Sequence, residues 1–210
     1  MSTEILDLQA QLEAELAAQK QSLPGTTSRI GTKGKIFSLP DGTTSEGPLQ
    51  CIILDWRWQH SFFEGIYNSN NPKPPVCFAS SKYEHELKPD PSSEKPQAED
   101  CESCPKNVFG SGISGKGKAC KNSARLAIVP ANPTADMTPW VIDIPPTAQK
   151  GLIGYINALQ KTGKLTVQMV TEIDFDQKVD YPTTTFANKG EHKHIQIAMG
   201  LREKAQNLLK

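Results

Sequence analysis

The chain has 210 residues, with 23 basic and 23 acidic side chains that balance to a formal net charge of zero. Hydrophobic residues make up 37% and charged residues 22%, which is the composition of a globular chain long enough to bury a core. This composition excludes a wholly disordered protein and a strongly basic nucleic-acid-binding protein. Binding to a charged polymer would therefore have to rest on an uneven distribution of charge along the chain.

The sequence shows no membrane-spanning or export segment. No stretch is as long and apolar as a membrane helix requires, and the acidic N-terminus lacks the apolar core of a signal peptide. We therefore expect an intracellular protein without a membrane partner. Because thiols stay reduced inside cells, the five cysteines indicate metal ligands rather than disulfides, and the odd number leaves at least one over.

Taken in chain order, the first expected element is an N-terminal helix over residues 3–21, within a segment 1–24 that Pro24 ends. Strand-like patterns follow, and the first of them carries glycines that indicate a bend. A helix is expected from Pro145 to Lys161, and residues 200–210 are expected to form a C-terminal helix or tail. The expected strands cover residues 29–39, 49–63, 124–129, 140–144, 165–175 and 194–198.

The strand over residues 49–63 has the strongest pattern in the chain, because β-branched and aromatic residues dominate it. Tryptophans at a period of two, such as Trp56 and Trp58, are most often core residues. The alternative is an exposed ladder on which bases stack, with Arg57 between the two rings on the opposite face, and with Phe62 and Phe63 as extensions. The period of two places on one face Ile52, Leu54, Trp56, Trp58, His60 and Phe62, and on the other Asp55, Arg57 and Gln59.

A long irregular segment separates this strand from the next one. Residues 67–100 are rich in proline and show no sustained periodicity, and loops of this length inside a domain are usually functional or disordered. We interpret residues 66–122 as an insertion, bearing a metal site, within one domain that spans residues 25–199.

The expected order of elements is strand, strand, insertion, strands, helix, strand, strand. A helix between the third and fourth strands of a small barrel is the connectivity of the OB-fold, which binds single-stranded nucleic acid on one sheet face. Many mixed α+β domains share this order. The sequence thus predicts a mainly β, α+β protein, with an OB-like β-barrel as its architecture.

Four cysteines gather around the insertion, and their spacing indicates a structural metal site. Cys101 and Cys104 form a C-x-x-C knuckle, in which one turn presents two thiolates to a tetrahedral ion. Cys120 lies where a hairpin returns a third ligand, and Cys77 would supply the fourth from across the long loop. Four thiolates without an open position predict a structural Zn²⁺ that holds down a polar segment.

Other assignments of these residues stay open. His85 lies in the same loop and is an alternative to Cys77 as the fourth ligand. A redox pair at the knuckle and an iron–sulfur cluster fit less well, because Pro105 follows the knuckle and the first gap between cysteines is wide. Cys51 is interpreted as a buried apolar residue.

A glycine-rich basic segment lies between the knuckle and Cys120. Residues 110–116 match G-x-x-x-x-G-K, but Gly117 stands where a P-loop needs a hydroxyl, so we reject nucleotide hydrolysis. Such a hairpin brings backbone amides and ammonium groups close to phosphates, with Phe109 as a stacking ring; a solvated turn is the alternative. No acid occurs from Pro105 to Arg125, where the basic residues are Lys106, Lys116, Lys118, Lys121 and Arg125.

Two further clusters of polar residues could be explained either as functional sites or as ordinary polar residues of strands. His192 and His194 beside Glu191 resemble a metal-binding pattern, but exposed polar residues of an edge strand explain them more simply. Asp174 and Asp176 form a carboxylate pair of the kind a nuclease uses, although the polar face of a strand also accounts for them.

The stretch CESCPKNVFGSGISGKGKACKNSARLAIV, residues 101–129, followed by the segment PPTAQKGLIGYINAL, resembles a family of tailed-bacteriophage proteins. The likeness covers roughly residues 75–160. It implies a zinc-containing OB-fold protein that binds single-stranded DNA in phage replication or recombination, and hence a place in the host cytoplasm. It also implies zinc on the four insertion cysteines, with Lys116 and Lys118 near the polymer. The C-terminus REKAQNLLK departs from the acidic tail with which many single-strand binders recruit partners.

Together these patterns predict a non-enzymatic single-stranded DNA-binding protein, with replication or recombination proteins as further candidate partners. The alternative is a protein-interaction module that recruits a polymerase or host factor through the zinc loop and the N-terminal helix. A metal-dependent nuclease that uses Asp174 and Asp176 is a further alternative. The oligomeric state stays open, and a dimer is one option.

Overall fold

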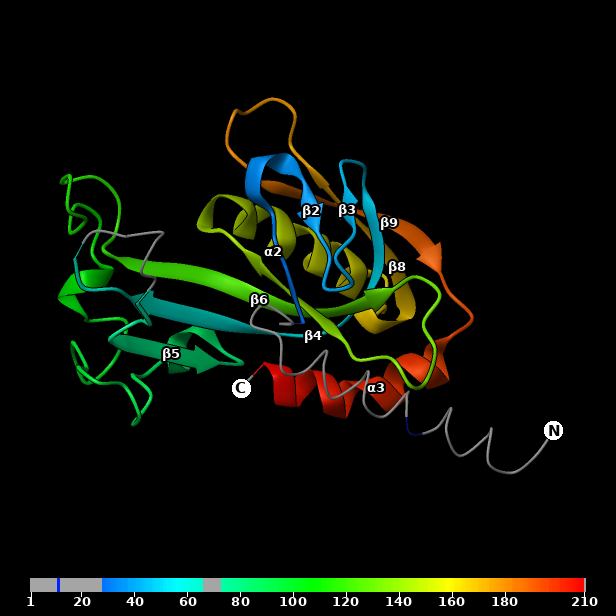
Figure 1. Cartoon of the computed structure of the whole chain (residues 1–210), viewed down its shortest axis with the longest axis horizontal. Coiled ribbons are helices and arrows are strands. Elements are labelled where there is room, and N and C mark those ends of the chain that lie inside the picture. Colours follow the sequence, from blue (N-terminus) through cyan, green and yellow to red (C-terminus); the bar gives the residue numbers. More distant parts are fainter. Residues whose placement is uncertain (1–10, 12–27, 66–72, 210) are drawn as a thin grey trace.

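The computed structural model describes Gln11 and residues 28–65 and 73–209, and shows a mixed α+β protein made mostly of sheet (Figure 1). The helix expected over residues 3–21 lies outside the described residues, apart from Gln11, which is helical. No described helix is long and apolar enough to cross a membrane.

The described strands form one large sheet and one small hairpin. The large sheet has the order β1-β7-β6-β4-β8-β9, and β5 pairs with a part of β4 that β8 leaves free. The hairpin joins β2 (Phe37–Ser38) and β3 (Thr44–Ser45). The strands of the large sheet are β1 (Arg29–Ile30), β4 (Leu49–Phe62), β5 (Cys77–Ser81), β6 (Cys120–Pro130), β7 (Trp140–Ile144), β8 (Met169–Phe175) and β9 (Thr184–Glu191).

The large sheet stays open. Its strand pairs are antiparallel except for β1 and β7, which are parallel. Strand β1 pairs with the outer edge of β7, and β9 pairs with β8 at the other end of the sheet. Within the described ranges, β1 and β9 do not pair with each other, so the sheet does not close. The α+β class is confirmed, whereas a closed barrel is not found in the described residues.

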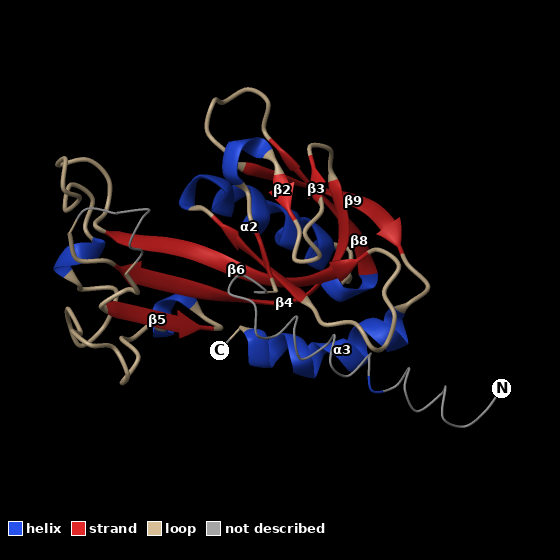
Figure 2. Cartoon of the chain, in the orientation of Figure 1, coloured by secondary structure: helices blue, strands red, loops and turns tan. Residues whose placement is uncertain are grey.

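Two helices cover opposite faces of the sheet (Figure 2). Helix α2 (Pro146–Lys161) packs Leu152 and Tyr155 against one cluster of buried strand residues, and α3 (Ile195–Leu208) packs Leu201 against the other. Each helix buries an apolar stripe at spacings of three and four, which is the pattern of a helix lying on a sheet. The expected helix from Pro145 to Lys161 is confirmed.

Strands β4 and β6 form a long arm that extends past the other strands of the sheet. Their register runs from Cys51 opposite Pro130 to Phe62 opposite Cys120. Because β7 pairs only with residues 124–128 of β6, the far end of the arm carries just β5 beside it (Figure 1). The described loops of the insertion, residues 63–65, 73–76 and 82–119, gather around this end (Figure 1).

A β-bulge in β4 corrects the expected alternation of that strand. The register shifts between Ile53 and Asp55, so one extra residue changes which face the following side chains take. Ile52 therefore packs on the α3 face, whereas Trp56 packs on the α2 face, four positions further along. The prediction that these two residues share a face is wrong, because a period-two pattern does not reveal a bulge.

Other expected boundaries also need correction. Residues 194–198, expected as a strand, lie at the start of α3, where Ala198, Leu201 and Ala205 form a helical stripe. The last strand is β9 instead, a largely exposed edge strand whose polar residues hide its pattern. Residues 29–39 divide into β1, a short 3-10 helix (Lys33–Lys35) and β2, and residues 166–168 form a 3-10 turn before β8. The proline-rich loop contains one unexpected strand, β5.

Candidate functional site

The outer end of the β4–β6 arm presents different chemistry on its two faces. Residues at even positions, such as His60 of β4 and Cys120 of β6, line a small enclosed cavity. Residues at odd positions, such as Ser61, Lys121 and Ser123, line a broad groove. The alternation of a strand thus turns most of the thiol cluster and most of the polar groove to opposite sides of the same two strands, although Cys120 and Asn122 also line the groove.

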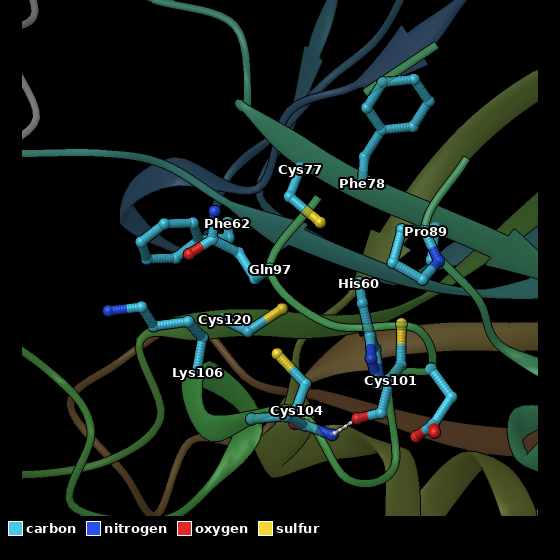
Figure 3. Close-up of a pocket in the computed structure, with 13 residues that line it drawn as sticks. His60, Phe62, Cys77, Phe78, Pro89, Gln97, Cys101, Cys104, Lys106 and Cys120 are labelled. Carbon is cyan, nitrogen blue, oxygen red and sulfur yellow. Dashed lines mark hydrogen bonds between the residues drawn. The ribbon is translucent and has the colours of Figure 1, made fainter. Parts of the chain in front are cut away.

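The enclosed cavity collects all four cysteines of the insertion. Cys77 begins β5, Cys101 and Cys104 lie in the knuckle, and Cys120 begins β6. All four are buried and free of disulfides, and they line one cavity of about 10 Å³. Figure 3 shows their sulfur atoms turned toward the space between them.

The donor set fits a four-coordinate thiophilic ion such as Zn²⁺, whose bonds to sulfur are about 2.3 Å long. Burial and then the neighbouring thiols raise the pKa of Cys101 to about 11 and that of Cys120 to about 12. Among the described residues, no three His, Cys, Asp or Glu side chains already hold metal-binding geometry. An ion would therefore have to draw the sulfurs together and displace their protons.

Cys77 lines the thiol cavity, whereas its expected alternative, His85, lines a neighbouring pocket that Cys101 and His60 also border. His85 is exposed and near Glu86, and it lies outside the thiol cavity that Cys77 lines. His60, which sequence reasoning did not select as a ligand, is buried among the thiols, and its Nδ1 has no hydrogen-bond partner in the described residues. Burial, together with the charge of Lys118, lowers the pKa of His60 to about 4, so the ring is neutral at pH 7.

The glycine-lysine hairpin, residues 108–118, is a compact loop closed by its own backbone. Gly110 and Gly112 both donate their N–H groups to the Gly117 carbonyl, at 2.6 and 3.3 Å. A Cβ atom added to Gly112 would lie 2.4 Å from the Lys116 carbonyl oxygen, so only glycine fits there. On this loop the side chains of Phe109 and Ile113 are 80% and 81% exposed.

The groove on the other face has a volume of about 890 Å³. The arm supplies Gln59, Ser61 and Phe63 from the β4 side and Lys121, Ser123 and Arg125 from β6. The remaining walls come from the glycine-lysine hairpin, the start of α2 and the loop between β8 and β9, through Phe109, Lys118, Gln149 and Pro182.

The charge of the groove is positive, with four basic and two acidic residues. Arg125 forms a bidentate salt bridge with Asp143, with Nε donating to Oδ1 at 2.7 Å and Nη2 donating to Oδ2 at 3.2 Å. Arg29 donates a further hydrogen bond to the same carboxylate. One carboxylate shared by two arginines leaves an excess of positive charge. Lys118 and Lys121 add to it, while Glu84 is the second acidic residue of the lining.

Aromatic rings lie next to these charges. The Lys121 ammonium is 4.9 Å from the centre of the Phe63 ring, and the exposed Phe109 lines the same groove. The groove therefore combines cations with flat apolar surfaces, which is the combination that single-stranded nucleic acids require.

Of the nine expected nucleic-acid contacts, the groove brings together Phe109, Lys118, Lys121 and Arg125. Trp56 and Trp58 do not line it, because both are partly buried against the α2-side core, and Lys82 lies 4.8 Å from the Trp56 ring. Arg57 is on the groove face, paired in register with Arg125, but does not line the groove.

The two other expected lysines also lie outside the groove. Lys106 sits over the Phe62 ring at 5.3 Å and lines the thiol cavity, and Lys116 is exposed on the hairpin. Conversely, Arg29, Gln59 and Pro182 line the groove without having been selected. No local pattern marks these three residues, since they come from distant segments that meet only in the fold.

The remaining clusters have local structural roles. Asp174 accepts a hydrogen bond from the Phe175 N–H and Asp176 accepts one from the Lys178 N–H. Both ring nitrogens of His192 are in contact with backbone, at the Val167 carbonyl and the His194 N–H. Cys51 is fully buried in the core, where burial raises the pKa of its thiol, which confirms its interpretation as an apolar residue.

Comparison with known proteins does not extend this picture. No protein-family model, no curated protein and no solved structure matches the chain.

Proposed function

We propose that this protein binds single-stranded DNA in the groove beside the β4–β6 arm. The observation that carries the proposal is the groove itself, which combines an excess of positive charge with two aromatic rings, Phe63 and Phe109, and with uncharged polar side chains. Cations neutralise phosphates and release counterions, while exposed rings provide stacking surfaces for unpaired bases.

The place of the groove in the topology supports the same proposal. OB-folds bind oligonucleotides on their second and third strands and with the loops between strands 1 and 2 and strands 4 and 5. If β4, β6, β7, β8 and β9 are counted as the five strands of such a fold, the groove is lined from the equivalent positions. Arg125 and Asp143 come from the second and third strands, Lys118 from the first loop and Pro182 from the last.

The thiol cluster supports the binding site from the opposite face of the arm. We propose that Cys77, Cys101, Cys104 and Cys120 hold a structural Zn²⁺. The ion would link β5, the knuckle and β6, and so hold the hairpin that carries Phe109 and Lys118. The resemblance of residues 101–129 to phage proteins favours a role in phage replication or recombination.

The test is a titration of a fluorescently labelled oligothymidylate of about 20 nucleotides, followed by anisotropy, with a matched duplex as comparison. We expect stronger binding to the single strand. About three phosphate contacts predict a slope of log K against log [salt] of about −2. Absence of salt-sensitive binding at micromolar protein would refute the proposal.

A pair of charge-matched variants locates the site. K118A/K121A removes two cations from the groove, and affinity should fall about 30-fold if each contributes roughly 1 kcal/mol. K161A/K204A removes the same charge from α2 and α3, outside the groove, and should bind like the wild type. Equal losses in both variants would place the strand elsewhere.

A protein-interaction module is the second candidate, and one observation favours it. Val108, Phe109 and Ile113 are exposed apolar side chains on one short hairpin. Exposed apolar clusters of this kind mark protein contacts as well as stacking surfaces. Equal binding of single strand and duplex, or none of either, would make this the better explanation of the hairpin.

A further inference from the structure

We propose that Asn107 couples the thiol cluster to the groove, so that metal at the four cysteines and DNA in the groove strengthen each other's binding. The inference rests on the proposed function and states how that site is regulated. It makes Asn107 a positioning residue, because Asn107 lines the thiol cavity but not the groove.

Asn107 is held by both residues of the knuckle. Its main-chain N–H donates to the Cys104 carbonyl at 2.9 Å, and its side-chain Nδ2 donates to the Cys101 carbonyl at 2.7 Å. These two bonds fix the amide group to the turn that presents two of the four sulfurs. Any rearrangement of that turn must therefore move the amide with it.

The oxygen of the same amide serves the groove. Asn107 Oδ1 accepts hydrogen bonds from Lys118 Nζ at 3.0 Å and from Asn122 Nδ2 at 2.9 Å. Both donors line the groove. An amide oxygen has two lone pairs, so this acceptor is fully used by the two groove residues.

In the structure no three ligands already hold metal-binding geometry among the described residues, so an ion would have to draw the sulfurs of the knuckle together. Closure of the knuckle on an ion would fix Asn107, and Asn107 would fix Lys118 and Asn122 in the groove. Binding of a strand to Lys118 would favour the same closed knuckle. The two effects are equal in size by thermodynamic reciprocity.

The experiment compares oligothymidylate affinity for zinc-loaded and chelator-treated protein in reducing buffer. For the wild type we expect metal removal to weaken binding about tenfold. N107L removes the three side-chain hydrogen bonds of Asn107. In this variant the same treatment should change affinity less than about twofold. Q97L is the matched control, because Gln97 lines the thiol cavity but, among the described residues, its amide donates to the Lys95 carbonyl and not to the knuckle.

A second variant and a second readout keep the outcome decisive. N107D keeps the oxygen for Lys118 but loses the donor to Cys101, so it should also be uncoupled. Hydrogen exchange of residues 108–119 needs no DNA: metal should slow it more in the wild type and Q97L than in N107L, where the flanking Cys104 and Cys120 alone would transmit the effect of the ion. An equal metal effect in wild type and N107L would overturn the coupling. Failure of the wild type to bind DNA would refute the proposed function, while the exchange result would still decide the coupling.

Discussion

At the scale of single residues, the five cysteines divide by their place in the fold. Cys51 lies in the core beneath α2, whereas the other four line one cavity at the far end of the arm. The spacing of Cys101, Cys104 and Cys120 indicates a cluster because these residues are close in sequence. The membership of Cys77 depends on β5, which no periodicity predicted.

We expect Cys104→Ser to lose tightly bound zinc, because a hydroxyl is a poor replacement for a thiolate in a four-sulfur site. Metal analysis of the purified protein measures this loss. Cys51→Ala is the control, since Cys51 lies outside the cavity, and this variant should keep its zinc. Retention of zinc by the Cys104 variant would exclude Cys104 as a ligand.

Phe109→Ala should weaken binding of single-stranded DNA by about 1–3 kcal/mol without lowering the stability of the fold, because the ring is 80% exposed. Anisotropy titration and thermal unfolding separate the two quantities. Ile113→Ala removes an equally exposed side chain from the same hairpin, but one that does not line the groove. Equal effects of both variants would show that the hairpin binds through general apolar contact instead of stacking.

At the scale of elements, β4 is joined to β5 and α3 through one buried carboxylate. Asp55 bonds to Lys82 from the end of β5 and accepts a hydrogen bond from Gln206 of α3 at 3.2 Å, with Arg202 3.5 Å away. Burial raises the pKa of Asp55, but the hydrogen bonds from Lys82, the Trp56 N–H and Gln206 outweigh it and hold that pKa below its usual value. The bulge in β4 is what turns Asp55 toward α3.

Asp55→Asn should lower the free energy of unfolding by about 1.5 kcal/mol, because the charge-assisted bonds to this carboxylate are lost while Lys82 and Arg202 remain partly hydrated. Urea unfolding at neutral pH measures the change. Glu64→Gln is the control, since its ion pair with Lys95 is more than half exposed on both sides and should contribute little.

The same carboxylate predicts a pH dependence. A folded-state pKa below the unfolded value of about 3.9 stabilises the fold above that pH, and this contribution is lost as pH falls through the folded pKa. The stability difference between wild type and Asp55→Asn should therefore shrink below about pH 4. A difference that is constant from neutral pH to acid would show that the carboxylate does not act through its charge.

At the scale of the whole molecule, the core and the insertion have separate clusters of buried residues, and Trp58 packs against both. Two large clusters of buried residues lie between the sheet and its two helices, whereas the insertion has a small cluster of Ala79, Leu87 and Cys101. A cluster of this size contributes little hydrophobic free energy compared with the core. The insertion therefore depends on other links, and the thiol cluster is placed to supply them.

We expect chelation in reducing buffer to loosen the insertion while the body of the sheet stays folded. Hydrogen exchange should become faster in residues 73–119 and stay unchanged in α2 and β8. The C104S protein should already show the faster pattern without chelator. Uniform loss of protection across the chain would mean that the metal stabilises the whole fold as one unit.

The elements whose patterns are local could be predicted from the amino-acid sequence. The helix from Pro145 to Lys161, the two strands before it, the strand β8 after it, the C-x-x-C knuckle and the basic hairpin all follow from spacing between near neighbours. These features set the α+β class and the candidate zinc ligands, because hydrophobic periodicity and ligand spacing act over a few residues.

The tertiary structure alone decided which of those residues share a surface. The bulge at Ile53–Asp55 turned the tryptophans into the α2-side core, and the pairing of β1 with β7 left the sheet open. The groove draws Arg29, Phe63, Lys118 and Pro182 from segments far apart in the chain. Side chains so distant in sequence meet through strand register and loop packing, which no local pattern encodes.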